Sequence, residues 1–196
     1  MAKLLSLLLV FVFYFATASA KEADATGDHL AAANFVRSSC QATTYPAKCV
    51  QSLIGLSTVI QKSPLRLANM ALTVSLSRAK KTNTYVHSLA KYKGLKRGEV
   101  GAIADCCQVI DDTVEKLNSS MKEMKGLSPG IDFLWHVSNL ETWISAALTD
   151  ENTCTDGFYG EALDARIKAE IKNRMVDVGQ VTSNALALIT KYAAEH

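Results

Sequence analysis

Apolar residues recur at alternating steps of three and four positions along most of this chain. The clearest run follows Gly98 and comprises Val100, Ile103, Cys107, Ile110, Val114, Leu117, Met121 and Met124. This spacing places all of these side chains on one face of an α-helix. No segment shows a convincing alternation typical of a strand. The sequence therefore predicts an all-α protein.

Three further apolar seams indicate three more long helices. They comprise Leu65, Ala68, Leu72, Ala79 and Val86; Phe133, Val137, Leu140, Ile144, Ala147 and Cys154; and Leu163, Ile167, Ile171, Val178, Val181, Ala185 and Leu188. Helix breakers lie ahead of and between the seams, at Pro64, Gly94, Gly98, Gly126, Pro129, Gly130, Gly157 and Gly160. Because short connections force consecutive helices to run antiparallel, we expect an up-and-down four-helix bundle over about residues 64–194.

Two shorter helices are expected ahead of the bundle, over residues 29–39 and 47–60. A turn-favouring stretch separates them, and Cys40 and Cys49 lie on either side of it. A disulfide between these cysteines would hold together a helical hairpin, at about residues 28–61, that is too short to be stable alone.

The other three cysteines are Cys106, Cys107 and Cys154, so five in total leave one thiol unpaired in an oxidising compartment. Cys107 lies on the apolar seam, where a free thiol behaves as a small hydrophobe. Cys106 lies one step round the helix, towards a neighbouring helix. We therefore expect a Cys106–Cys154 disulfide and a buried free thiol at Cys107.

The first twenty residues have the features of an export signal. Lys3 precedes an apolar run, and small residues follow at Ala18 and Ala20. We predict a signal peptide over residues 1–20 and one secreted domain over residues 21–196. No later stretch approaches the roughly 20 apolar residues of a membrane-spanning helix, so no membrane partner is expected.

Charge and motifs exclude several classes of function. Removing Lys3 with the signal leaves 20 basic and 19 acidic residues, which gives no argument for a nucleic-acid partner. The chain has no G-x-S-x-G sequence, no zinc-ligand spacing, and four histidines without suggestive neighbours. We expect no catalytic site, no cofactor and no metal.

Several stretches with correctly ordered cysteines carry a resemblance to a known family. They are CQATTYPAKC at residues 40–49, residues 104–106 and 111–112, and SAALTDENTCTDGF at residues 145–158. Over about residues 30–192 the chain resembles the plant invertase and pectin methylesterase inhibitors. That family's fold is a helical hairpin on a four-helix bundle, with its first and second pairs of cysteines bridged. This chain departs from the family at Cys107, where Leu is usual, and at Ile110, where Tyr is frequent.

Members of this family inhibit either pectin methylesterase or acid invertase, and the fold does not separate them. Invertase inhibitors resemble one another in a late Pro-Lys-Phe motif, which is absent here, and no proline follows Pro129. The resemblance thus implies a secreted pectin methylesterase inhibitor of the cell wall, or apoplast. An inhibitor of acid invertase is the alternative.

The resemblance also implies a contact surface, since such inhibitors cover the enzyme's substrate cleft in a one-to-one complex. The matching positions here are Gln108, Asp112, Glu115, Thr153 and Asp156. Asp112 and Glu115 share one helix face, and the expected disulfide brings them near the other two helix positions. A solvated helix face is the ordinary alternative. Because carboxylates titrate near pH 4, inhibition is expected to vary with pH.

Three further features have two explanations each. A basic cluster is most simply a solvated loop, and contact with an acidic polymer such as pectin is its alternative; its members are Lys91, Lys93, Lys96 and Arg97. Asn118 begins an Asn-Ser-Ser sequence that fits the rule for N-glycosylation near the end of an expected helix, and it is either used or left unmodified. Trp135 and Trp143 are expected to be packing residues, and contact with a ligand is the alternative.

Overall fold

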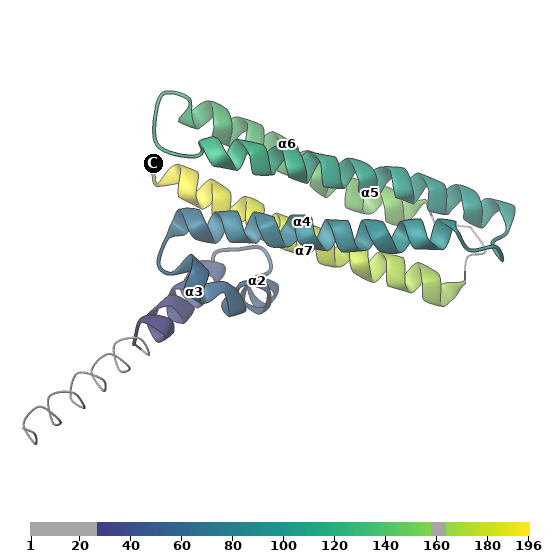
Figure 1. Cartoon of the computed structure of the whole chain (residues 1–196), viewed down its shortest axis with the longest axis horizontal. Coiled ribbons are helices and arrows are strands. Elements are labelled where there is room, and N and C mark those ends of the chain that lie inside the picture. Colours follow the sequence, from purple (N-terminus) through teal and green to yellow (C-terminus); the bar gives the residue numbers. More distant parts are fainter. Residues whose placement is uncertain (1–26, 158–163) are drawn as a thin grey trace, which may run out of the picture.

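The computed structural model describes residues 27–157 and 164–196, so the predicted signal peptide lies outside the described residues. Four long helices form the body: α4 (Pro64–Ala90), α5 (Arg97–Glu123), α6 (Phe133–Asp156) and α7 (Ala165–Ala194). They run alternately up and down along one long axis (Figure 1). The described part of the chain contains no strand. The predicted fold class is confirmed.

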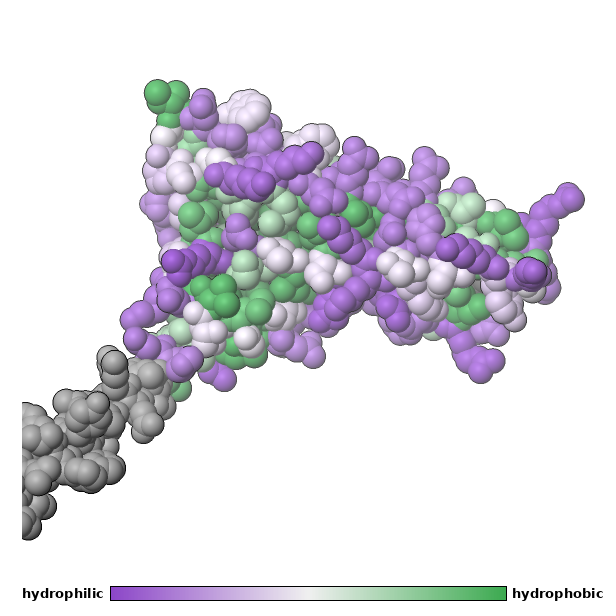
Figure 2. Space-filling view, in the orientation of Figure 1, coloured by the Kyte–Doolittle hydropathy of each residue, from purple (hydrophilic) through white to green (hydrophobic). Residues whose placement is uncertain are grey.

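The apolar seams form the core of the bundle. Large side chains from all four helices are fully buried there, among them Leu72, Ile103, Ile110, Leu117, Leu140, Ile144, Ile171 and Met175. Hydrophilic side chains cover most of the visible face (Figure 2). Within the described ranges, no helix combines the length and the apolar character that a membrane crossing requires.

The start of α5 differs from the expectation. Val100 was expected in the core but is 50% exposed, and Gly98 lies inside the helix and not in the connection before it. The carboxylate of Glu99 is buried and accepts a hydrogen bond from the backbone N–H of Lys96 at 2.6 Å. This cap fixes the helix start at Arg97 and turns Glu99 inward in place of Val100.

The hairpin precedes the bundle. Residues 27–40 form its first helix, and Cys40 is disulfide-bonded to Cys49, with Cα atoms 5.6 Å apart. The single helix expected over residues 47–60 is in fact α2 (Pro46–Leu53), a 3-10 turn η1 (Ile54–Leu56) and α3 (Ser57–Ile60). Gly55, at the centre of η1, is the weakest helix former of this stretch.

Polar contacts fix the hairpin to the bundle. The buried Asn184 of α7 accepts a hydrogen bond from the backbone N–H of Tyr45 and donates one to its carbonyl, each at 2.9 Å. Lys48 of α2 forms an ion pair with Asp177 of α7 at 2.8 Å, and Arg78 of α4 reaches the same carboxylate at 3.5 Å. Side chains of α7 therefore hold the hairpin, and Arg78 of α4 supports one of them, Asp177.

Candidate functional site

Helices α5 and α6 are joined by three sets of contacts that fix their antiparallel register. The Cys106–Cys154 disulfide lies near one end, with Cα atoms 4.6 Å apart. A polar cluster around Asp150 follows towards the middle. At the other end His136 Nδ1 lies 2.7 Å from Glu123 Oε2. With this register, residues on the two helices face outward at defined levels.

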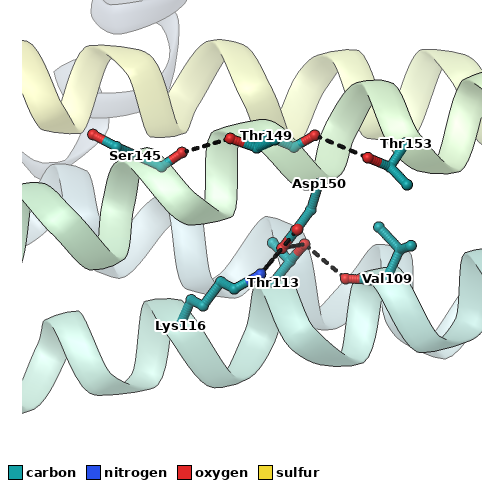
Figure 3. A network of polar contacts seen from close by, with 7 residues as sticks. All are labelled: Val109, Thr113, Lys116, Ser145, Thr149, Asp150 and Thr153. Carbon is teal, nitrogen blue, oxygen red and sulfur yellow. Dashed lines mark hydrogen bonds and ion pairs between the residues drawn. The ribbon is translucent and has the colours of Figure 1, made fainter.

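The polar cluster around Asp150 is a local network between the helices (Figure 3). Lys116 Nζ donates to both carboxylate oxygens of Asp150, at 2.9 and 2.8 Å. The hydroxyl of Thr113, itself 1% exposed, lies 3.1 Å from Asp150 Oδ2 and 3.0 Å from the carbonyl oxygen of Val109. Asp150 is therefore neutralised within the protein and is not available to a partner.

A row of hydroxyl groups follows the exposed side of α6. Thr153 donates to the carbonyl of Thr149, and Thr149 donates to the carbonyl of Ser145, at 3.3 and 3.2 Å (Figure 3). Each hydroxyl oxygen keeps its acceptor sites free after donating to its own helix. The row is thus a line of hydrogen-bond acceptors facing solvent.

All five residues predicted to contact a partner are exposed. On α5, Gln108, Asp112 and Glu115 follow one another at steps of four and three, which places them on one outward face. Among the described residues, none forms an ion pair with Asp112 or Glu115. We call the exposed positions Gln108, Asp112, Glu115, Ser145, Thr149, Thr153 and Asp156 the α5–α6 face.

The neighbouring Asp111 shows why only one of the two adjacent aspartates belongs to this face. Its carboxylate lies 3.0 Å from Nε2 of His87 and 2.5 Å from the amide of Asn83, both on α4. Consecutive helical residues point about 100° apart. Asp111 therefore joins α4 to α5, and Asp112 faces solvent.

The α5–α6 face is longer than the sequence led us to expect. Asp112 and Glu115 lie on one side of the disulfide level, and Asp156 lies on the other because it follows Cys154. At 1.5 Å per residue, Glu115 and Asp156 are about 16 Å apart along the bundle axis. The α5–α6 face is thus elongated and extends to both sides of the disulfide level. Of its residues on α6, only Thr153 lies close to the level of Gln108.

Cys107 lies on α5 but does not belong to the α5–α6 face, because it is buried. Its thiol is unpaired and 8% exposed, and burial, followed by the charge of Asp111, raises its pKa. Asn118, the possible glycosylation site, is half-buried and donates from its side chain to the carbonyl of Val114 at 2.8 Å. Its use for a glycan stays a prediction.

Sequence reasoning missed two features. The Lys116–Asp150 pair was not predicted. The only sign of it in the sequence is that a basic and an acidic residue lie on two helices predicted to be neighbours. Trp135 and Trp143 were expected to pack but are 60% and 39% exposed, and Ile131 and Leu134 beside Trp135 are exposed as well. Ile131 precedes α6, and Leu134 and Trp135 lie on the outward side of its first turn, between the buried Phe133 and Val137.

Comparison with known proteins identifies relatives of this chain. Residues 34–188 match the sequence model of the family described as plant invertase/pectin methylesterase inhibitor. The 21 kDa protein of Daucus carota is 48% identical over 164 residues, which cover 83% of this chain and 85% of the relative. Pectinesterase inhibitor 11 of Arabidopsis thaliana is 46% identical over 168 residues, which cover 84% of this chain and 83% of the relative.

A solved structure shows the same fold. The crystal structure of mutant form A of a pectin methylesterase inhibitor from Arabidopsis covers 77% of this chain and 92% of its own, with a TM-score of 0.62 at 17% sequence identity. Relatives named for inhibiting an enzyme agree with the expectation that this chain is not itself an enzyme. From the family match and these identities, the chain belongs to the plant invertase/pectin methylesterase inhibitor family.

Proposed function

We propose that this protein is a secreted inhibitor of pectin methylesterase that acts in the cell wall. The observation that carries the proposal is its 46% identity to a relative named pectinesterase inhibitor, over 84% of this chain. A second Arabidopsis relative with such a name, pectinesterase inhibitor 9, is 42% identical over 88% of the chain. Secretion is supported by the export signal predicted at residues 1–20.

The proposed mechanism is occlusion of the enzyme's substrate cleft by the α5–α6 face in a one-to-one complex. Three observations support this surface: its polar side chains are exposed, Asp112 and Glu115 lack ion-pair partners among the described residues, and the disulfide holds both helices in register. A rigid surface loses little conformational entropy on binding. The inhibitor would exclude pectin by its shape, without any bond being made or broken.

The experiment is inhibition of pectin methylesterase by the Thr153→Ala and Asp156→Ala double variant. We expect a loss of inhibition of at least about tenfold, because both side chains would lose hydrogen bonds to the enzyme. A matched control removes one back-bonded helical hydroxyl and one exposed carboxylate elsewhere, by Thr84→Ala with Glu195→Ala. Unchanged inhibition by the first variant, with its fold intact, would exclude this surface.

The family name also covers inhibitors of invertase, so acid invertase is the alternative target. Titration of the purified protein against each enzyme separately distinguishes the two. We expect inhibition of the methylesterase alone.

A further inference from the structure

We propose that the connection between α4 and α5 is a binding site for an acidic polysaccharide, specifically a chain of unesterified uronic acid units. The site comprises Tyr92 and four cationic residues within five positions of it in the sequence, Lys91, Lys93, Lys96 and Arg97, and we call it the cationic loop. All five side chains are exposed, and Tyr92 is 65% exposed. The proposal depends on charge, on the position of the aromatic ring and on the order of the loop.

The four cations of the loop have no ion-pair partner in the part of the chain that the structure describes. The sequence has no acidic residue between Asp28 and Glu99, so α4 contributes only basic charges, including the exposed Lys80 and Lys81. Glu99 itself is buried and is occupied by the Lys96 backbone N–H. The loop therefore carries four positive charges without an ion-pair partner among the described residues, in a chain that is nearly neutral overall.

The ring of Tyr92 is held in a defined position on this loop. A Cβ atom placed on Gly94 would lie only 2.8 Å from Cε1 of the ring, so the ring rests against the glycine. Its large exposed fraction shows that the ring remains open to solvent. The face of an aromatic ring carries partial negative charge and attracts the C–H groups of a sugar ring. Tyr92 thus provides a stacking surface with lysines on either side.

The backbone of the loop is anchored at both ends, so its course is fixed before any ligand binds. The backbone N–H of Tyr92 donates to the carbonyl of Leu89 at 2.9 Å, and Leu95 packs against the core. The bond from Lys96 to Glu99 closes the other end. A preordered site loses less conformational entropy on binding than a flexible loop would.

A ligand that fits these features has sugar rings for Tyr92 and regularly spaced carboxylates for the lysines. A uronic acid polymer has both, and it is what a methylesterase produces when it removes methyl esters from pectin. The choice of polymer rests on the proposed function. The binding test below contains no enzyme, however, so failure of the cationic loop and failure of the inhibitory α5–α6 face can be told apart.

The test is calorimetric titration of the mature chain with a short oligomer of unesterified galacturonic acid at low salt. We expect binding that weakens as salt is added, and no binding of the fully methyl-esterified oligomer, which carries no charge. The Lys91→Gln and Lys93→Gln double variant should bind about tenfold more weakly, the size expected for two exposed ion pairs. Its control, Lys122→Gln with Lys125→Gln, removes the same charge from the opposite end of α5 and should leave binding unchanged.

A second pair of variants tests the stacking surface without changing any charge. Gly94→Ala should displace the Tyr92 ring and weaken binding, whereas Gly101→Ala, which meets no atom within 4 Å, should not. If the two lysine double variants lost the same affinity for the oligomer, the proposal would be overturned. Equal affinities of the two glycine variants would also overturn it. Equal binding of the esterified oligomer, or of a single-stranded oligonucleotide, would overturn the choice of ligand.

Discussion

At the scale of single residues, the fold changes the chemistry of Cys107 most clearly. Burial and the nearby Asp111 raise the pKa of this thiol, and the side chain is 8% exposed. Because the thiolate is the reactive form, both effects protect it from electrophiles. We expect iodoacetamide to label Cys107 far more slowly in the native protein than in urea, as measured by mass spectrometry over time.

The direction of the pKa shift adds a second requirement to this prediction. Above the pKa of the unfolded thiol, the native thiol still holds its proton, so its labelling rate should continue to rise with pH after that of the unfolded chain has levelled off. Coincident pH profiles would contradict the raised pKa. Equal labelling rates in the two states would contradict burial of the thiol.

Two glycines of similar type should respond in opposite ways to the same substitution. A Cβ on Gly126 would collide with the imidazole ring of His136, and that ring is held by Glu123. We expect Gly126→Ala to lower the free energy of unfolding by about 1–2 kcal/mol, because the ring must move. Gly101→Ala, in an open part of α5, should raise it by about 0.5–1 kcal/mol.

Urea unfolding of both glycine variants measures this contrast. A neutral or stabilising Gly126→Ala would show that the turn after α5 accommodates the methyl group without disturbing the His136–Glu123 pair. The Gly101 variant serves as the control for the general effect of replacing glycine in this helix.

At the scale of elements, the pairing of α5 with α6 depends on Asp150 as well as on the disulfide. The side chains of Lys116 and Asp150 are only 24% and 15% exposed. Asp150→Ala would leave the ammonium group of Lys116 and the hydroxyl of Thr113 without this partner. We expect a loss of about 2 kcal/mol in the free energy of unfolding, measured in urea.

The control for this prediction is Asp156→Ala, which removes an exposed carboxylate from the same helix and should have little effect on stability. If both variants lose stability equally, the Asp150 cluster does not contribute to the pairing of the helices. Asp150→Asn should fall between the two, because an amide oxygen still accepts from Thr113 and Lys116.

Element boundaries show where sequence reasoning succeeds and where it stops. Periodicity predicted the four long helices because their buried faces repeat with helical spacing over many turns. It placed Val100 in the core wrongly, because the inward position in the first turn is occupied by Glu99, which caps the helix. It also read residues 47–60 as one helix, since a single Gly55 does not reveal a change to 3-10 geometry.

At the scale of the whole molecule, the hairpin and the bundle are joined by few polar contacts. Asn184→Ala would remove both hydrogen bonds to the backbone of Tyr45. We expect the free energy of unfolding to fall by about 1–2 kcal/mol. Relative to the unchanged protein, hydrogen exchange should accelerate more in residues 46–60 than in α5 and α6. Exchange that accelerates equally in all helices would contradict a local role for Asn184.

The candidate site was predictable only in part. The resemblance supplied the positions on α5 and α6, and helical spacing supplied their common face. The length of the α5–α6 face could not be predicted, because it depends on the register of two antiparallel helices. That register is fixed by pairs such as Lys116–Asp150 and Glu123–His136, which are far apart in sequence.

The central claim is that the α5–α6 face occludes pectin methylesterase in a one-to-one complex. The most direct measurement is the residual activity of a fixed amount of enzyme as purified inhibitor is added. We predict a linear fall that ends at one equivalent of inhibitor, and a much shallower fall with the Thr153→Ala and Asp156→Ala variant. Full enzyme activity in the presence of a large excess of correctly folded protein would contradict the account.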